Sequence, residues 1–82
     1  MAILNMKELL NIAYRDRYAV GSFNVINLEF LEAIVEAAEN KRSPVILSIA
    51  EVHFKFVNVE NIAPAIKFVA ERSSVPVVLH LD

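Results

Sequence analysis

Hydrophobic residues recur at helical spacing in three separate segments of the chain. The first segment follows Asn5, and Glu8 three residues later completes a capping-box pattern that is typical of a helix start. The second follows Asn27, which can act as an N-cap, and it carries glutamates on the side opposite its apolar residues. The third covers residues 60–73. The pattern therefore predicts a short opening helix and two longer helices.

Three compact apolar runs alternate with these helices, and each is predicted to be a β-strand: residues 18–24, 44–50 and 75–82. The resulting order is helix, strand, helix, strand, helix, strand, which implies parallel strands joined by right-handed crossovers. The chain has no internal repeat, and its single glycine and three prolines leave no room for a flexible linker. We therefore expect residues 1–82 to form a continuous piece of a single domain.

The start of the third helix depends on Pro64. A proline inside a helix removes one hydrogen bond and clashes one turn back, at a cost of ~3 kcal/mol or more. Capping by Asn61 would place Pro64 in the first turn without this cost, whereas capping by Asn58 would require a kink. The segment before it, residues 51–58, is expected to be a connection with one helical turn.

Side-chain alternation along the three strands defines two faces of the predicted sheet. One face is apolar throughout and suits a layer of helices; it consists of Gly21, Phe23, Val45, Leu47, Ile49, Val77, Leu79 and Leu81. The other begins apolar in each strand and becomes small or polar towards the carboxyl end; it consists of Val20, Ser22, Asn24, Ile46, Ser48, Ala50, Val78, His80 and Asp82.

This gradient favours a barrel over an open sheet. A (β/α)8 barrel has packed layers at the bottom of its interior and a solvated mouth where the chemistry takes place. An open sheet also binds ligands past its strand ends, but its second face should be covered and apolar along most of its length. The predicted fold is therefore α/β, the amino-terminal portion of a (β/α)8 TIM barrel with a short preceding helix. Three of eight strands would leave two unpaired edges and an uncovered inner face.

The composition of the chain limits the kinds of molecule that it could bind. The chain is 56% hydrophobic and 22% charged, more apolar than a small monomer of 82 residues should be, so it either oligomerises or belongs to a larger fold. A net charge of -2 supplies no basic surface for nucleic acid or an anionic membrane. There is no cysteine, which excludes a disulfide or a thiolate metal site within these residues. No signal peptide or spanning run is evident, so a cytoplasmic protein is expected.

The polar residues of the strand ends each have a structural explanation as well as a functional one. Asp82 follows a buried strand and is either the rim of a site or a cap for a following helix. His80 is more often a hydrogen-bonded core histidine than a metal ligand, because no accompanying donors stand at metal-binding spacing. Asn24 can line a site or satisfy backbone groups where the strand turns. Lys55 reads as an ordinary solvated lysine rather than a Schiff-base residue.

Six short segments carry a family resemblance when they are taken together and in order: YAVGSFNV (18–25), NLE (27–29), EAA (36–38), RSPVIL (42–47), VPV (75–77) and LHLD (79–82). They resemble the amino-terminal part of the class II, metal-dependent ketose-bisphosphate aldolases, and the resemblance covers essentially the whole chain. The subgroup resembled is the bacterial fructose- and tagatose-bisphosphate aldolases, whose fold is a (β/α)8 barrel preceded by a short helix.

The resemblance implies reversible cleavage of a ketose 1,6-bisphosphate, fructose or tagatose, into dihydroxyacetone phosphate and glyceraldehyde 3-phosphate. In this family a divalent ion, usually zinc, polarises the ketone and stabilises the enediolate. Asp82 matches the catalytic aspartate that shuttles a proton beside the scissile bond, and Asn24 matches a position that lines the substrate pocket. The family commonly forms homodimers or homotetramers.

Two departures from the family pattern bear on the site. Members commonly place Ser or Thr at the substrate-contacting position that Ala50 holds, followed by a Glu-Gly step, whereas this chain reads AEVH over residues 50–53. The family's first metal-binding histidine follows the position of Asp82, and the other ligands come much later. The resemblance therefore assigns no metal ligand within the chain and implies that the 82 residues alone are inactive. Two alternatives stay open: a small non-catalytic βα binding or regulatory module, and another TIM-barrel sugar-phosphate lyase or isomerase.

Overall fold

The structure of the chain is a computed structural model that describes residues 3–49 and 59–81. It alternates strands and helices as the periodicity predicts. In chain order the elements are β1 (Ile3–Leu4), α1 (Met6–Asp16), β2 (Gly21–Asn24), α2 (Leu28–Asn40), β3 (Val45–Ile49), α3 (Val59–Arg72) and β4 (Val77–Leu81).

The four strands form one sheet in the order β1-β4-β3-β2, and every neighbouring pair is parallel. The predicted parallel pairing of the three longer strands is therefore confirmed. The prediction of three strands was wrong in number, because β1 adds Ile3 and Leu4 to the free edge of β4, opposite Val77 and Val78. A two-residue strand is too short to show alternation in the sequence, and it forms only where a sheet edge offers unpaired backbone groups.

Two asparagines start helices as predicted. The Asn5 side chain accepts a hydrogen bond from the Glu8 backbone N–H at 2.8 Å, as an N-cap does, and its side-chain amide donates one to the Glu8 carboxylate. The Asn27 Oδ1 atom accepts from the Phe30 backbone N–H at 2.9 Å. Both caps satisfy helix-end donors that would otherwise lack a partner, which fixes where α1 and α2 begin.

The third helix begins earlier than a cap at Asn61 would allow. It starts at Val59, so Pro64 lies inside α3 rather than in its first turn. The ring deprives the Glu60 carbonyl of its helical donor. Glu60, Ala63 and Pro64 are all exposed, so this part of α3 faces solvent and water can replace the missing donor.

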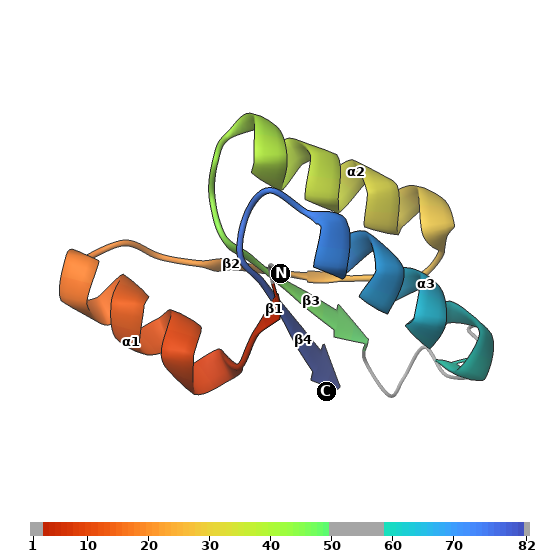
Figure 1. Cartoon of the computed structure of the whole chain (residues 1–82), viewed down its shortest axis with the longest axis horizontal. Helices are drawn as coiled ribbons and strands as arrows, with labels where there is room; N and C mark the ends of the chain where they lie inside the picture. Colours follow the sequence, from red (N-terminus) through yellow and green to blue (C-terminus); the bar gives the residue numbers. More distant parts are fainter. Residues whose placement is uncertain (1–2, 50–58, 82) are drawn as a thin grey trace.

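The larger core lies on the sheet face under α2 and α3, which we call the helix face. Figure 1 shows α2 and α3 lying together on one side of the sheet and α1 apart from them. This core is formed by residues of β3 and β4, by the apolar stripes of α2 and α3, and by one residue from each of two loops: Val25, Leu31, Val35, Ala38, Val45, Leu47, Ile49, Ile66, Val69, Ala70, Val75 and Val77.

The opposite side of the sheet, which we call the open face, carries a smaller core at its amino-terminal end. There Ile46 of β3 and Val78 of β4 pack with Leu9 of α1, and Leu4 and Val20 join them partly buried. The opening helix therefore closes one end of the open face. The two separate clusters confirm that side-chain alternation assigns these residues to two faces.

Neighbouring strands differ sharply in burial. All five residues of β3 are buried, whereas all four residues of β2 are exposed. At this edge the Phe23 ring folds back over Gly21, and a Cβ atom on Gly21 would lie 2.5 Å from the ring. Because Gly21 has no side chain, it leaves room for the Phe23 ring.

Candidate functional site

The strand register brings three polar residues into one row across the open face. Asn24 of β2 pairs with Ser48 of β3, and Ser48 pairs with His80 of β4. Each of the three comes two residues after a member of the preceding row, which consists of Ser22, Ile46 and Val78. Alternation therefore places both rows on the same face, with the polar residues nearer the carboxyl ends of the strands. We call Asn24, Ser48 and His80 the polar row.

The environment changes across a single step along the strands. Ile46 and Val78 are buried at 5% and 0% exposure against α1, whereas Asn24 and His80 are exposed. Ser48, in the middle strand, is buried at 4%. For the described residues this is the gradient that the sequence predicts, with an apolar layer at one end of the open face and polar groups at the other.

Only part of the predicted site can be placed. Asn24 lies at the carboxyl end of β2, in the same row as His80. The interpretation of His80 as a core histidine was wrong, because the residue is exposed near the carboxyl end of β4. The predicted catalytic Asp82 and the predicted substrate-binding Ala50 lie outside the described residues, as does Lys55. Ser48 was placed on this face by alternation but not singled out as a site residue. The signal that could have identified Ser48 is its polar side chain within the otherwise apolar run of residues 44–50.

The chemistry available in the polar row is hydrogen bonding. The Asn24 carboxamide both donates and accepts, the Ser48 hydroxyl does the same, and a neutral His80 ring offers one donor and one acceptor. Within residues 3–49 and 59–81 no group of three His, Cys, Asp or Glu side chains could hold a metal ion. The polar row therefore offers uncharged donors and acceptors at the carboxyl ends of three neighbouring strands.

A pKa shift occurs at Arg15 of α1, away from the polar row. A hydrogen bond from the Arg15 guanidinium to Asp16, at 3.2 Å, together with the attraction between their charges, raises the pKa of Arg15 above its ordinary value. Both side chains are exposed, so this pair contributes to the surface of α1 and not to a site.

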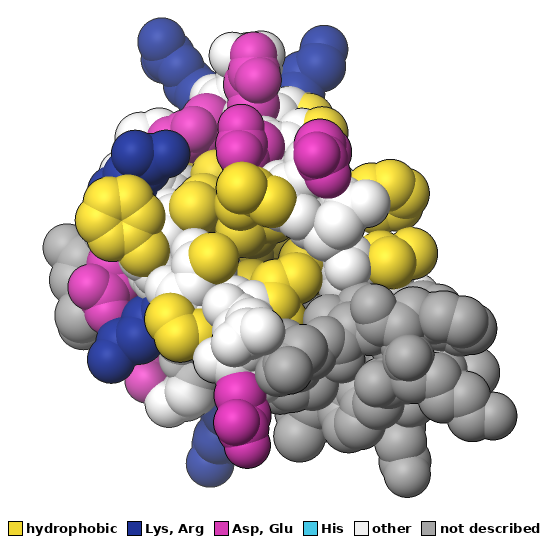
Figure 2. All heavy atoms as spheres, turned by 90° about the vertical axis from the view of Figure 1, so that its right-hand side faces the viewer, with side chains coloured by type: hydrophobic (Ala, Val, Ile, Leu, Met, Phe, Trp, Pro, Cys, Tyr) yellow, Lys and Arg dark blue, Asp and Glu magenta, His cyan; other side chains and the backbone are white. Residues whose placement is uncertain are grey.

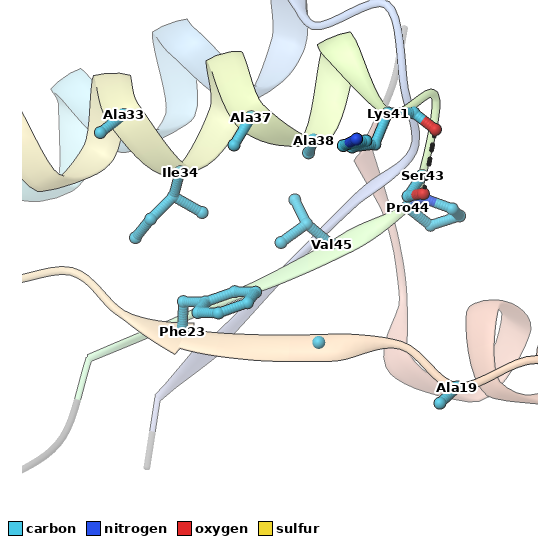
Figure 3. A pocket seen from close by; sticks show the side chains of 11 residues that line it. Ala19, Phe23, Ala33, Ile34, Ala37, Ala38, Lys41, Ser43, Pro44 and Val45 are labelled. Carbon is cyan, nitrogen blue, oxygen red and sulfur yellow. Dashed lines mark hydrogen bonds between the residues drawn. The ribbon is translucent and has the colours of Figure 1, made fainter.

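A different hollow lies on the helix face, between the edge strand β2 and α2. It has a volume of about 520 Å³, and Phe23, Ile34 and Val45 point into it from three elements (Figure 3). At one end the Ser43 hydroxyl donates a hydrogen bond to the Lys41 carbonyl at 3.2 Å. Its wall is otherwise mostly alanine and other apolar side chains, which suits packing rather than catalysis.

Hydrophobic side chains also reach the surface where α2 and α3 begin. Figure 2 looks onto this side of the molecule and shows apolar side chains gathered at its centre, with acidic and basic side chains above them. Leu28 and Phe30, in the first turn of α2, are each 48% exposed. Among the described helices none is long and apolar enough to span a membrane.

Comparison with known proteins identifies the family. The family model described as fructose-bisphosphate aldolase class II matches residues 4–82. The chain belongs to this family. The resemblance inferred from the strand and helix segments is thus confirmed, and the possibility of a barrel enzyme from another family is set aside.

The chain is also similar in sequence to individual proteins that are named aldolases. The chain is 42% identical over 85 aligned positions to a fructose-bisphosphate aldolase of Geobacillus stearothermophilus, which takes in 100% of this chain and 30% of that protein. It is 41% identical over 85 positions to a 6-phospho-5-dehydro-2-deoxy-D-gluconate aldolase of Bacillus licheniformis, covering 100% of this chain and 29% of that protein. The chain thus spans about 30% of the length of these two aldolases.

A solved structure shows the same fold. The crystal structure of the YdjI aldolase from Escherichia coli K12 superposes with a TM-score of 0.93 and 31% sequence identity, covering 98% of this chain and 31% of that chain. The α/β arrangement of four parallel strands and three helices is therefore that of the amino-terminal part of an aldolase TIM barrel. The predicted fold class is confirmed, with one more strand than expected.

Proposed function

We propose that this chain is the amino-terminal part of a class II aldolase that reversibly cleaves a ketose 1,6-bisphosphate to dihydroxyacetone phosphate and glyceraldehyde 3-phosphate. Residues 1–82 form a partial domain that supplies the first strands of the barrel and one sector of its mouth. The observation that carries this proposal is the polar row, which stands at the carboxyl ends of parallel strands in a chain of this family. Active sites of TIM barrels lie at this end of the strands.

One residue is assigned to the chemistry and two are assigned to substrate binding. Asp82 acts as the general acid and base, moving a proton at the substrate oxygen beside the bond that breaks. Asn24 hydrogen-bonds the sugar from the end of β2, where its exposed carboxamide can both donate and accept. Ala50 lines the pocket without a hydroxyl, which removes one hydrogen bond that a serine or threonine there would offer.

A divalent cation, zinc or a similar ion, belongs to this proposal, with ligands outside these residues. Within the described part of the chain the donor set does not fit a metal ion: no three candidate ligands cluster, and His80 is flanked in its row by Ser48, which is not a metal ligand of choice. In this proposal the chain holds the substrate and moves a proton.

A second substrate is favoured by a specific observation. Relatives named 6-phospho-5-dehydro-2-deoxy-D-gluconate aldolase are 41% and 40% identical to the chain, nearly the same as the 42% of the Geobacillus fructose-bisphosphate aldolase. Both are aldol cleavages of phosphorylated keto-sugar compounds. The second candidate function is therefore the same reaction class on this other substrate.

The test is an activity assay on the complete polypeptide that the gene encodes. Fructose 1,6-bisphosphate, tagatose 1,6-bisphosphate and 6-phospho-5-dehydro-2-deoxy-D-gluconate are offered separately, and release of the three-carbon product is measured. We expect one of the two bisphosphates to be cleaved with the highest kcat/KM, loss of activity in EDTA, and recovery when zinc is restored. Preference for the third substrate would replace the first candidate by the second. Activity that survives chelation would overturn the class II assignment.

The assembly state is a further expectation of the proposal. The hollow beside Phe23 and the half-exposed Leu28 and Phe30 leave apolar surface that a larger fold or a second subunit would cover. We propose a homodimer or homotetramer for the complete polypeptide. Sedimentation or light scattering measures the molar mass directly, and a monomer would contradict the proposal.

A further inference from the structure

The helix α2 has a second apolar side that does not face the core. Phe30, Ala33 and Ala37 follow one another at intervals of three and four residues, which places them on one side of the helix. Phe30 is 48% exposed, and both alanines are exposed as well. The core is contacted by other residues of α2, including Leu31 and Val35. We call Phe30, Ala33 and Ala37 the second apolar stripe; apolar residues on two sides are typical of a helix with neighbours on two sides.

The second apolar stripe borders the hollow beside the edge strand β2. Figure 3 shows Ala33 and Ala37 on the side of α2 that faces this hollow of about 520 Å³, with Phe23 of β2 across from them. The neighbouring helix α3 approaches a different side of α2, which carries Glu32 and Glu36. In the described sheet β2 is paired with β3 only, so its other edge offers unpaired backbone groups. A bare helix stripe beside an unpaired strand edge leaves room for one further strand and one further helix.

The charge at the hollow comes from Lys41, one turn after Ala37. In the part of the chain that the structure describes, the salt bridges join Arg15 to Asp16 and Lys67 to Glu71, and neither involves Lys41. A segment that covered this mostly apolar wall would take the Lys41 ammonium group out of water, which costs free energy unless an acid accompanies it. The segment that fits the hollow is therefore apolar along most of its length and acidic near Lys41.

The direction of the strands places the acidic end of such a segment. A helix that follows a strand parallel to β2 runs back towards the amino-terminal ends of the strands. Lys41 lies at that level, between the end of α2 and the start of β3 at Val45. The carboxyl-terminal end of the incoming helix would thus come to Lys41, and its partial negative charge favours a cation.

We propose that the hollow is the docking surface for a helix from the part of the complete polypeptide outside residues 1–82, and that a carboxylate of this helix pairs with Lys41. Because the chain spans about 30% of the length of the two aldolases compared above, a polypeptide of their length contains enough further chain for a strand on β2 and a helix on the second apolar stripe. Alanine at positions 33 and 37 lets the two helix axes approach closely. The inference rests on the proposed function for the existence of the complete polypeptide, but not on its substrate or chemistry.

The ion pair is tested directly by chemical crosslinking of the complete polypeptide. A carbodiimide joins an ammonium group to a carboxylate that lies against it, and mass spectrometry of the digested protein identifies both residues. We expect Lys41 to be joined to an aspartate or glutamate outside residues 1–82. Lys67, whose Nζ atom lies 3.8 Å from the Glu71 Oε1 atom, is the internal control. A Lys41 that stays free while Lys67 reacts, or that joins an acid within residues 1–82, would overturn the proposal.

Isotope mixing separates a helix of the same polypeptide from one of a second copy. Nitrogen-14 and nitrogen-15 forms of the protein are unfolded together, refolded and crosslinked. We expect each Lys41 crosslink to contain a single isotope. Crosslinked peptides that combine both isotopes would show that a second copy fills the hollow, and would refute the docking helix.

The cover over the stripe is measured by thiol labelling. Residues 1–82 contain no cysteine, so Ala37→Cys introduces a thiol that is easily followed, and Glu36→Cys on the acidic side is the matched control. Both positions are exposed in the described structure, so they differ only if another segment covers one of them. Relative to the same variant in urea, we expect folding to slow labelling more than about tenfold at position 37 and less than about twofold at position 36. Equal slowing at the two positions would contradict the proposal.

These readouts separate the docking helix from the proposed function. An active aldolase in which positions 36 and 37 label equally fast would overturn the docking helix and leave the proposed function intact. Slow labelling at position 37 in a protein that cleaves none of the three substrates would support the docking helix while the proposed function failed. If Ala37→Cys does not fold, crosslinking of Lys41 in the unaltered protein decides.

Discussion

The two faces of the sheet are built from the same three strands but are covered in opposite ways. On the helix face, α2 and α3 bury apolar side chains along the strands, with Leu47 exposed by only 2%. On the open face, α1 buries the amino-terminal layer, and the next layer is polar. The comparison teaches that two helices bury most of the helix face, whereas on the open face a single helix buries one layer and the exposed Asn24 and His80 follow it. Substitutions on the first face should therefore change stability, and those at the mouth of the second should change activity.

The largest expected effect is at the mouth. Asp82→Asn keeps the size of the side chain but removes its ability to take and return a proton, so we expect kcat to fall roughly 10²–10⁴-fold. The thermal melting temperature should hardly change. The matched control is Asp16→Asn on the surface of α1, which should leave kcat unaltered.

Kinetic assays and thermal melts of the complete polypeptide check this expectation. A melting temperature that falls together with kcat would assign Asp82 a structural role, such as capping the next helix. That result would mean that a substitution at Asp82 changes stability as well as activity, as is expected for the helix face.

A smaller but still large effect is expected on the helix face. Leu47→Ala deletes buried methyl groups from the centre of β3 and should lower the free energy of unfolding by about 2–5 kcal/mol. The same change at Leu10, which is 45% exposed on α1, should cost about 1 kcal/mol or less. Urea denaturation measures both values.

The activity of folded Leu47→Ala molecules sharpens the comparison further. We expect KM and kcat to stay close to those of the unaltered protein, because Leu47 alternates away from the open face. A large change in KM would show that the two faces are coupled through β3.

The smallest effect is expected at a helix cap. Asn27→Ala leaves the Phe30 backbone N–H without its acceptor and should lower the free energy of unfolding by about 0.5–2 kcal/mol. Asn11→Ala, at an exposed position within α1, provides the control and should be neutral or slightly stabilising. Urea denaturation of the two variants is the measurement. Equal costs for both asparagines would mean that the cap contributes nothing to stability.

Part of the polar row could be predicted because strand alternation is a local property. A period of two residues assigned Asn24 and His80 to one face, and Ile46 and Val78 to the layer beneath. The register of the row could not be predicted, since sequence alone does not say which residue of β2 lies opposite Ser48. The burial of Ser48 could not be predicted either, because it depends on the neighbouring strands that the fold places on both sides of β3.

The sequence by itself determined the alternating order of strands and helices, the caps at Asn5 and Asn27 and the two faces of the sheet. Each follows from contacts between residues only a few positions apart. The tertiary structure alone decided that Ile3 and Leu4 extend the sheet, that α3 begins at Val59, and that the polar row is aligned. These features depend on pairing and packing between distant segments, whose free energies a local pattern does not encode.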